Sequence, residues 1–263
     1  MRYFLLIILV LTCTRPAKAQ NDFCSIRNTS FKTGESVTLK VFYALGKMFI
    51  GAGEATFNVG LERFANRDVY HIVADGKTYR AYDWVFKVRD RYETYLDTAT
   101  LQPLKFVRNV NEGGYKIYNN VVFNQAGHQA ISTTGTYPVP PCVQDVISSI
   151  YYARNIDFSK YKPDDKIPFA MFLDDQVYNI YVRYMGKEEI KTKFGTFRAI
   201  KFKPLLIKGS MFEGGEKMTV WVSDDANKVP LRIESPISVG SVVVDMINYS
   251  NLRYPFTSLI RQR

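Results

Sequence analysis

Apolar and polar residues alternate along most of this chain, a pattern typical of half-buried β-strands. Val37, Leu39 and Val41, for example, alternate with Thr38 and Lys40. The same period of two predicts strands at 37–43, 55–59, 69–75, 84–88, 104–110, 115–123, 167–173, 177–184, 197–203, 216–222, 229–235 and 240–249. The chain is therefore expected to be dominated by β-sheet.

One segment has helical spacing instead. Its apolar residues fall at i, i+3, i+4, i+7 and i+8, namely Val143, Val146, Ile147, Ile150 and Tyr151. Pro141 stands where such a helix would begin, since proline suits the first helical turn. The pattern predicts an amphipathic helix over residues 142–154, with its apolar stripe against the sheet.

A weak duplication relates the two halves of the chain. Residues 31–37 resemble residues 161–167, and Asp97 and Pro103 recur as Asp224 and Pro230. Each half, about 31–123 and 161–249, is expected to form a meander, with the helix between them. The predicted fold is mainly β: an antiparallel, strongly curved sheet or open barrel with one amphipathic helix packed on it.

The N-terminus has the features of an export signal. A positive residue and a short apolar run are followed by Ala17-Lys18-Ala19, which predicts a cleaved signal peptide over 1–19 and Gln20 as the new N-terminus. Lipidation of Cys13 is the less favoured alternative, because no small residue precedes this cysteine. We expect a periplasmic or otherwise extracytoplasmic protein with a single β-rich domain at 20–250 and a basic tail at 251–263.

Export also changes the interpretation of charge and cysteines. Cleavage removes Arg2, Arg15 and Lys18, so the formal charge of +10 falls to +7. This excess is compatible with peripheral association with an anionic membrane, whereas export argues against nucleic acid as a partner. The two remaining cysteines, Cys24 and Cys142, are expected to form a disulfide in an oxidising compartment.

Catalytic and metal-binding motifs are missing from the sequence. His71 is expected to be a half-buried sheet residue and His128 a solvated residue near a turn. The acidic pairs Asp164-Asp165, Asp174-Asp175, Glu188-Glu189 and Asp224-Asp225 fall mostly in predicted turns, where aspartate is common. We therefore expect no cofactor, no metal and no enzymatic activity. A hydrolase with two carboxylates stays open as an alternative.

A surface for an amphipathic ligand is the more specific hypothesis. The stretch Tyr79–Trp84 mixes aromatic, cationic and acidic groups, as a sugar-stacking or lipid-headgroup surface does. Trp84, Phe86 and Val88 would share one face of strand 84–88 and meet the helix, leaving an apolar cleft. The ligand-binding residues of this hypothesis are Trp84, Phe86, Arg80, Lys87, Ile150 and Tyr151. Complete packing of the helix against the sheet is the competing expectation.

With these residues in hand, the chain resembles a bacterial family known as domain of unknown function 3108. The resemblance is carried by Phe31-Lys32-x-Gly34-Glu35, Gly51-x-Gly53, Asp97-x-x-Thr100-Leu101-x-Pro103, Glu112-Gly113-Gly114-Tyr115, Gln144-Asp145-x-x-Ser148, Tyr151-Tyr152-x-Arg154, Gly186-Lys187-Glu188 and Trp221-Val222-Ser223-Asp224-Asp225. It implies an exported, sheet-rich envelope protein and brings no catalytic residues.

Three functions are compatible with these features. The first is a non-enzymatic binding or carrier module for a lipid or a glycan, because curved sheets enclose ligand cavities. The second is an envelope glycan hydrolase. The third is a scaffold that adds a strand of a partner protein at an open sheet edge. The sequence leaves ligand, partners and oligomeric state undetermined.

Overall fold

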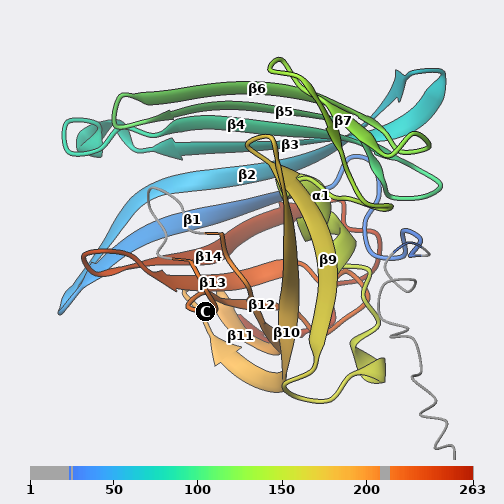
Figure 1. Ribbon diagram of the computed structural model, residues 1–263. Coiled ribbons are helices and arrows are strands. Elements are labelled where there is room, and N and C mark those ends of the chain that lie inside the picture. The colour runs from blue at the N-terminus through green and yellow to red at the C-terminus, as the bar shows by residue number, and fades with distance from the viewer. Residues whose placement is uncertain (1–23, 25, 208–213, 263) are drawn as a thin grey trace, which may run out of the picture.

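A single long antiparallel sheet, curled on itself, makes up most of the protein (Figure 1). The computed structural model describes residues 24, 26–207 and 214–262. The expected signal peptide, the cleavage site before Gln20 and Cys13 lie outside these residues. Within them, the mainly β, antiparallel architecture predicted from the sequence is confirmed.

The sheet has fifteen strands. Along the chain they are β1 (Ser36–Leu45), β2 (Met48–Phe64), β3 (Arg67–Thr78), β4 (Arg89–Asp97), β5 (Pro103–Glu112), β6 (Tyr115–Asn124), β7 (Gln129–Ile131), β8 (Thr136–Pro138), β9 (Lys166–Leu173), β10 (Gln176–Lys191), β11 (Gly195–Pro204), β12 (Thr219–Ser223), β13 (Pro230–Pro236), β14 (Ser241–Ser250) and β15 (Leu259–Gln262). Their order in space is β8-β7-β6-β5-β4-β3-β2-β1-β14-β13-β12-β11-β10-β9, and β15 pairs with β11.

The two halves of the sheet join where β1 pairs with β14, with Val41 opposite Val244. At the far edges, β8 and β9 approach each other without a shared backbone ladder. Side chains bridge this seam: Thr134 donates a hydrogen bond of 2.6 Å to Asp175, and the Tyr137 and Phe172 rings lie 5.8 Å apart. The sheet is therefore a barrel-like wrap that does not close through its backbone.

The helix is shorter than expected. α1 covers Val146–Ala153 instead of 142–154, because Asp145 caps it: the Asp145 side chain accepts a hydrogen bond from the Ser148 backbone N–H. The residues just before this cap are extended. Gln144 exchanges backbone hydrogen bonds with Ala170 and Phe172 of β9, at 2.9 and 2.8 Å. This segment thus extends the edge of the sheet instead of starting a helix at Pro141.

Two predicted strands also need correction. Residues 84–88 form no strand: β3 ends at Thr78, and a short 3-10 helix, η3 (Arg80–Tyr82), follows. The backbone then bonds locally, with the Phe86 N–H donating to the Tyr82 carbonyl at 3.1 Å, so the apolar alternation lies in a loop. The strand expected at 216–222 starts later, as β12 at Thr219. Residues 216–218, part of the expected strand, therefore precede β12.

The hydrophobic core of the curled sheet consists of two clusters of buried side chains. The larger cluster fills the space between the inner faces of β2–β6 and β9–β12, with Ile147 and Tyr151 of α1 in its middle. The smaller one contains Leu39, Trp221 and Met246. Residues 251–262, expected as a basic tail, cover this second cluster: Phe256 packs on Tyr249 with ring centroids 4.7 Å apart.

The predicted disulfide is present. Cys24 and Cys142 are bonded, with their Cα atoms 5.4 Å apart, across 118 residues of sequence. The bridge fixes the start of the described chain beside the segment that leads into α1.

The repeated sequence elements occupy corresponding turns. Asp97 and Pro103 flank the β4–β5 turn, and Asp224 and Pro230 flank the β12–β13 turn. In both turns a non-glycine residue adopts positive φ, Leu101 at 55° and Lys228 at 46°. The same local conformation therefore serves both turns, while the division of the chain into domains stays a prediction.

Candidate functional site

The structure separates the six residues proposed for ligand binding into two groups. Tyr151 is buried in the core, where its ring meets the Phe31 ring edge-on at 4.8 Å, and Ile150 is half-buried and packs against the same core. Trp84 and Phe86 lie on the loop between β3 and β4, together with Arg80 and Lys87, and all four residues are exposed. The helix and this loop do not meet, so the expected cleft between them is not formed.

The space beneath α1 is almost completely filled. A cavity of about 10 Å³ remains there, lined by Val37, Phe57, Ile150, Tyr151, Arg154 and Pro230. That volume is about what a single water molecule needs. An acyl chain does not fit, and the competing expectation of a packed helix–sheet contact describes this region.

The loop 79–88 is the strongest candidate for a contact surface. Trp84 has 84% of its surface exposed, Val85 63% and Phe86 45%. Consecutive large apolar side chains that are exposed to solvent mark interaction surfaces more often than isolated ones do. Arg80 and Lys87 stand on the same loop and are exposed as well.

A polar network holds the base of this loop. Both oxygens of Asp83 accept hydrogen bonds from Arg89, at 3.1 and 2.7 Å, and one also accepts from the Thr78 hydroxyl at 2.7 Å. The hydrogen bond from Thr78, supported by Arg89, lowers the pKa of Asp83. Asp83 is therefore ionised and bound at neutral pH, and the loop is presented in a defined shape.

The tip of the loop rests on the neighbouring β5–β6 turn. The Gly113 N–H donates to the Lys87 carbonyl at 2.8 Å, and Val88 forms a β-bridge with Glu112. Gly113 has a φ of +57°, and a Cβ on it would lie 2.5 Å from the Phe86 ring. Glycine at this position lets the loop and the turn form one projection. We call residues 79–88 and 113–115 the loop tip.

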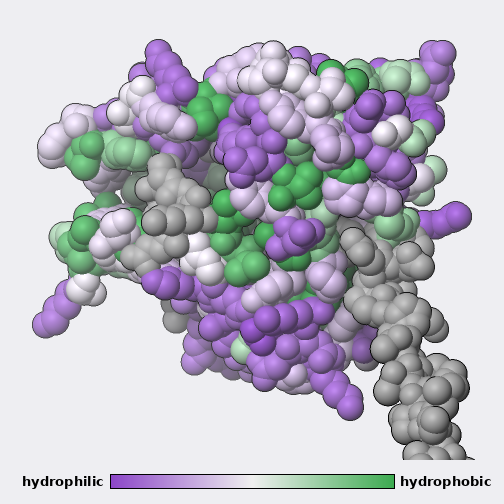
Figure 2. Space-filling view, viewed as in Figure 1, coloured by the Kyte–Doolittle hydropathy of each residue, from purple (hydrophilic) through white to green (hydrophobic). Residues whose placement is uncertain are grey.

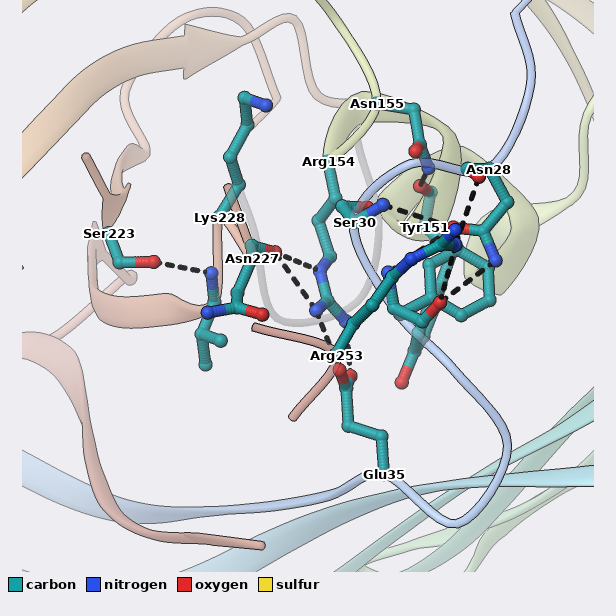
Figure 3. A network of polar contacts seen from close by, with 12 residues as sticks. Asn28, Ser30, Glu35, Tyr151, Arg154, Asn155, Ser223, Asn227, Lys228 and Arg253 are labelled. Carbon is teal, nitrogen blue, oxygen red and sulfur yellow. Dashed lines mark hydrogen bonds and ion pairs between the residues drawn. The ribbon is translucent and has the colours of Figure 1, made fainter. Parts of the chain in front are cut away.

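A second candidate is the buried polar network around Arg154 (Figure 3). Arg154, at the end of α1, donates to both oxygens of Glu35 at 2.5 and 3.0 Å and to the Asn227 carbonyl at 3.1 and 3.0 Å. Its guanidinium also lies over the Tyr151 ring, 5.1 Å from the centroid. Burial alone lowers the pKa of Arg154, but the charge of Glu35 outweighs it and raises the pKa.

This network is structural. Its two charged groups have almost no exposure, 3% for the side chain of Arg154 and none for that of Glu35. Substrate therefore cannot reach them. Three of the sequence motifs that resemble the family converge here: Gly34-Glu35, Tyr151-Tyr152-x-Arg154 and Trp221–Asp225 next to Asn227. Their shared role is to join the segment before β1, the helix end and the β12–β13 turn.

His71 is held between two carboxylates from neighbouring strands. Its ring nitrogens lie 2.7 Å from Glu62 and 2.8 Å from Glu93, and Tyr95 stacks on the ring at 4.3 Å. Burial raises the pKa of Glu93, but hydrogen bonds from Arg91 and His71 reverse this and keep it below its ordinary value. Sequence spacing missed these contacts because they cross from strand to strand. The half-buried position of His71 is as expected.

Each of the four acidic pairs has a member that is held by another part of the protein. A member of each pair binds a neighbouring donor: Asp165 the Lys162 N–H, Asp174 the Arg108 guanidinium, Glu188 the Trp221 indole and Asp224 the Lys187 ammonium. Among the described residues, no three histidine, cysteine or acidic side chains are arranged to hold a metal ion. In the same part of the chain, no helix has the length and apolarity needed to cross a membrane.

The architecture places the chain among barrel-like β proteins. A β-barrel-like protein of domain of unknown function DUF1849 from Brucella abortus has a similar structure, with a TM-score of 0.55 and 8% identity over 86% of this chain and 99% of that one. The chain itself belongs to the family described as protein of unknown function DUF3108, whose model matches residues 31–247. The expected family is thereby confirmed.

Two further solved structures are more distant. A provisionally named lipoprotein from Parabacteroides distasonis has a TM-score of 0.37 and 13% identity over 86% of this chain and 99% of that one. A provisionally named exported protein from Bacteroides fragilis with a YmcC-like fold has a TM-score of 0.33 and 13% identity, over 87% and 100%. These scores are too low to support an argument. No curated protein matches the sequence.

Proposed function

We propose that this protein is a non-enzymatic, extracytoplasmic binding module whose contact surface for an amphipathic ligand is the loop tip. The observation that carries the proposal is the exposure of Trp84, at 84%, beside two more exposed apolar residues on a loop with a fixed base. An amphipathic ligand would place its apolar part on Trp84 and Phe86 and an anionic headgroup near Arg80 or Lys87. This contact surface lies at one end of the sheet and not beneath the helix.

Aromatic side chains suit this role for a physical reason. Exposing the surface of a tryptophan to water costs free energy, about 25 cal/mol per Å² of apolar area, and a ligand recovers that cost on binding. The flanking cations add attraction for an anionic headgroup. Trp84 contributes almost no burial free energy to folding, and exposed apolar groups of this size mark interaction sites, which favours a role in recognition.

The alternative functions have less support. The acidic pairs bind cations, backbone N–H groups or an indole, so they supply no free pair of carboxylates for glycoside hydrolysis. The sheet edges are also short or covered: β8 has three residues and ends at Pro138, and β9 carries Pro168 and pairs with Gln144. Proline and a covering segment hinder the addition of a partner strand.

Trp84 fluorescence provides a direct test. Titration with a monomeric anionic lysolipid should shift the emission to shorter wavelength and raise the melting temperature, since a ligand that binds the native state stabilises it. The variant Trp84→Phe should lose the spectral shift, because buried Trp221, at 8% exposure, does not report on the surface. No change with anionic or neutral lysolipids or with soluble glycans would refute the proposal.

Native mass spectrometry extends the test to the natural ligand. Protein purified from its own envelope should carry a co-purified amphiphile. The double variant Trp84→Ser/Phe86→Ser should lose that molecule while retaining its melting temperature, because neither side chain belongs to the buried core. Leu61→Ser is the matched control: Leu61 is 54% exposed at the other end of β2. Equal loss of ligand in both variants would contradict the proposed site.

A further inference from the structure

Four turns of the sheet lie at the same end of the molecule. The strand register places the β1–β2 turn next to the β13–β14 turn, because Ala44 pairs with Ser241 and Leu45 with Met48. The β3–β4 loop and the β5–β6 turn extend the series along the sheet. In Figure 1 all four appear at the left-hand end, and the β2–β3 turn lies at the opposite end.

The β1–β2 and β13–β14 turns form a second apolar projection. We call residues 44–49 and 237–240 the hairpin tip. Met48 is 48% exposed, Phe49 42% and Leu45 41%, and Val239 beside them is 62% exposed. The two turns are tied together, because the Tyr43 hydroxyl donates to the Val239 carbonyl at 3.1 Å.

The two tips concentrate apolar surface at one end. Among the described residues, eight of the fourteen exposed large apolar side chains lie on them: Leu45, Met48, Phe49, Trp84, Val85, Phe86, Tyr115 and Val239. Figure 2 shows hydrophobic surface on both left-hand projections, next to more polar surface. Turns are normally polar, so this concentration calls for a partner that covers both tips at once.

The charges at this end are mainly positive. The two tips carry exposed Lys47, Arg80 and Lys87, with Lys116 directly after Tyr115. The acidic residue within the tips, Asp83, is bound by Arg89 in the loop base, and Glu112, directly before Gly113, is half-buried. Lys193, in the β10–β11 turn, adds a cation 4.5 Å from the Phe42 ring and 4.8 Å from the Phe49 ring, against the hairpin tip.

We propose that the loop tip and the hairpin tip together form a docking surface for an anionic lipid bilayer. The inference rests on the proposed function in taking Trp84 and its neighbours as a lipid contact, and it extends that contact to the whole end of the sheet. Apolar and aromatic side chains would enter the interfacial region, where tryptophan and tyrosine are favoured. The lysines and arginine would remain at the headgroups.

A bilayer fits these features better than one ligand molecule or a second copy of the chain. The apolar residues stand on two separate projections, so a broad and deformable surface can contact both. The exposed cations of the tips would repel the same cations of a second copy, whereas anionic headgroups attract them. Each basic residue near such a surface contributes about fivefold in affinity.

Vesicle binding tests the docking surface. The protein should sediment with vesicles of phosphatidylglycerol and phosphatidylcholine, bind pure phosphatidylcholine much less, and release at high salt. Trp84 emission should shift to shorter wavelength and be quenched by brominated acyl chains. The variant Trp84→Phe should still bind, without the shift.

Matched variants separate this surface from general effects. Lys47→Glu/Lys87→Glu should weaken binding by at least about 25-fold, since two basic residues are lost. Arg63→Glu/Lys160→Glu changes the net charge equally, but away from the tips, and should have a small effect. Met48→Ser/Phe49→Ser should weaken binding, whereas Leu61→Ser should not. Melting temperatures should change little in the charge variants and in Leu61→Ser. Met48→Ser/Phe49→Ser also removes the stacking of Phe49 on buried Phe42, 4.7 Å between ring centroids, so its vesicle binding is compared at a temperature where it is folded.

The outcomes distinguish this inference from the proposed function. Lysolipid binding without vesicle binding would overturn the docking surface and leave the proposed function intact. Vesicle binding that depends on the tips, without binding of lysolipids or soluble glycans, would support the docking surface and overturn the proposed function. A concentration-dependent dimer that the tip variants abolish, without vesicle binding, would overturn the inference in favour of self-association.

Discussion

Arg154 and Glu35 form a bidentate ion pair in the interior, although 119 residues separate them in sequence. The pair joins the C-terminal end of α1 to the segment that enters β1. The Asn227 carbonyl accepts two further hydrogen bonds from the same guanidinium, so a third part of the chain is held at this point. Asn227 in turn accepts the Tyr254 N–H at 2.9 Å, which extends the connection to the C-terminal segment.

Breaking this pair should destabilise the protein strongly. Arg154→Met or Glu35→Leu leaves one buried charge without its partner, at a cost of about 3–5 kcal/mol in unfolding free energy. The double variant removes both charges, so its loss of unfolding free energy should be smaller than the sum of the losses in the two single variants. Urea unfolding followed by fluorescence measures these values. Arg63→Ala, in an exposed pair, is the control expected to change little; additive losses in the double variant would contradict the argument.

Asp145 should make the protein less stable as pH rises through the mildly acidic range. Burial raises the pKa of Asp145 to about 6 from 3.8, so the folded state binds a proton that the unfolded state has lost between these values. The unfolding free energy should therefore fall by about 2–3 kcal/mol between pH 4 and pH 7 through this group. Asp145→Asn retains the cap and should remove this contribution.

Asp157 provides the control with the opposite sign. It caps η4 (Phe158–Lys160), and hydrogen bonds from Ser159 lower the pKa of Asp157. Its stabilising effect is therefore present at neutral pH and lost as pH falls through its folded pKa. The measurement is thermal unfolding from pH 3 to pH 8 of Asp145→Asn, Asp157→Asn and the parent protein. If Asp145→Asn and Asp157→Asn change the pH dependence in the same direction, the assignment for Asp145 is wrong.

Removing the disulfide should cost several kilocalories per mole. The Cys24–Cys142 bridge closes a loop of 118 residues, for which the chain-entropy model gives about 4–5 kcal/mol. Cys24→Ala/Cys142→Ala should show this loss in urea unfolding. A reductant should lower the melting temperature of the parent protein and leave that of the double variant unchanged; insensitivity of both would argue against the bridge.

Gly113 and Gly114 should differ in their effect on lipid binding. Both have positive φ, so alanine strains the backbone at each, by about 1–2 kcal/mol. A Cβ on Gly113 meets the Phe86 ring, whereas nothing lies within 4 Å of a Cβ on Gly114. Gly113→Ala should therefore displace Phe86 and weaken vesicle binding about fivefold, the equivalent of losing part of one apolar contact. Gly114→Ala should bind as the parent does, and equal affinities for the two variants would count against the loop tip.

Sequence patterns predicted the class of fold because alternation reports directly on strands with one buried face. Val37 and Leu39 are buried and Thr38 lies between them, as the pattern requires. The same reasoning failed at 84–88, where Trp84, Phe86 and Val88 alternate within a loop. Alternation shows that apolar residues share a direction, and it does not show whether that direction leads to the core or to solvent.

The positions of the candidate residues could be predicted in part, while their binding of a ligand stays a prediction. Trp84, Phe86, Arg80 and Lys87 stand together on one loop, as their nearness in sequence implies, whereas Ile150 and Tyr151 belong to the core. The hairpin tip was missed, because Leu45 and Met48 look like ordinary strand ends. A signal was available in Leu45-Gly46-Lys47-Met48-Phe49, a turn with apolar residues on both sides of its glycine and lysine. The position of Val239 beside it follows from strand pairing over a long distance, which no local pattern contains.

The pairing of β1 with β14 has a consequence for the order of events in biogenesis. Roughly two hundred residues separate the paired positions, so the two halves of the sheet cannot join until almost the entire chain is available. Contacts of such high sequence separation make folding slow. For the export that the N-terminal sequence predicts, this delay would keep the polypeptide unfolded during transport. The pairing of β1 with β14 and the oxidation of Cys24 and Cys142 would then both take place after arrival in an oxidising compartment.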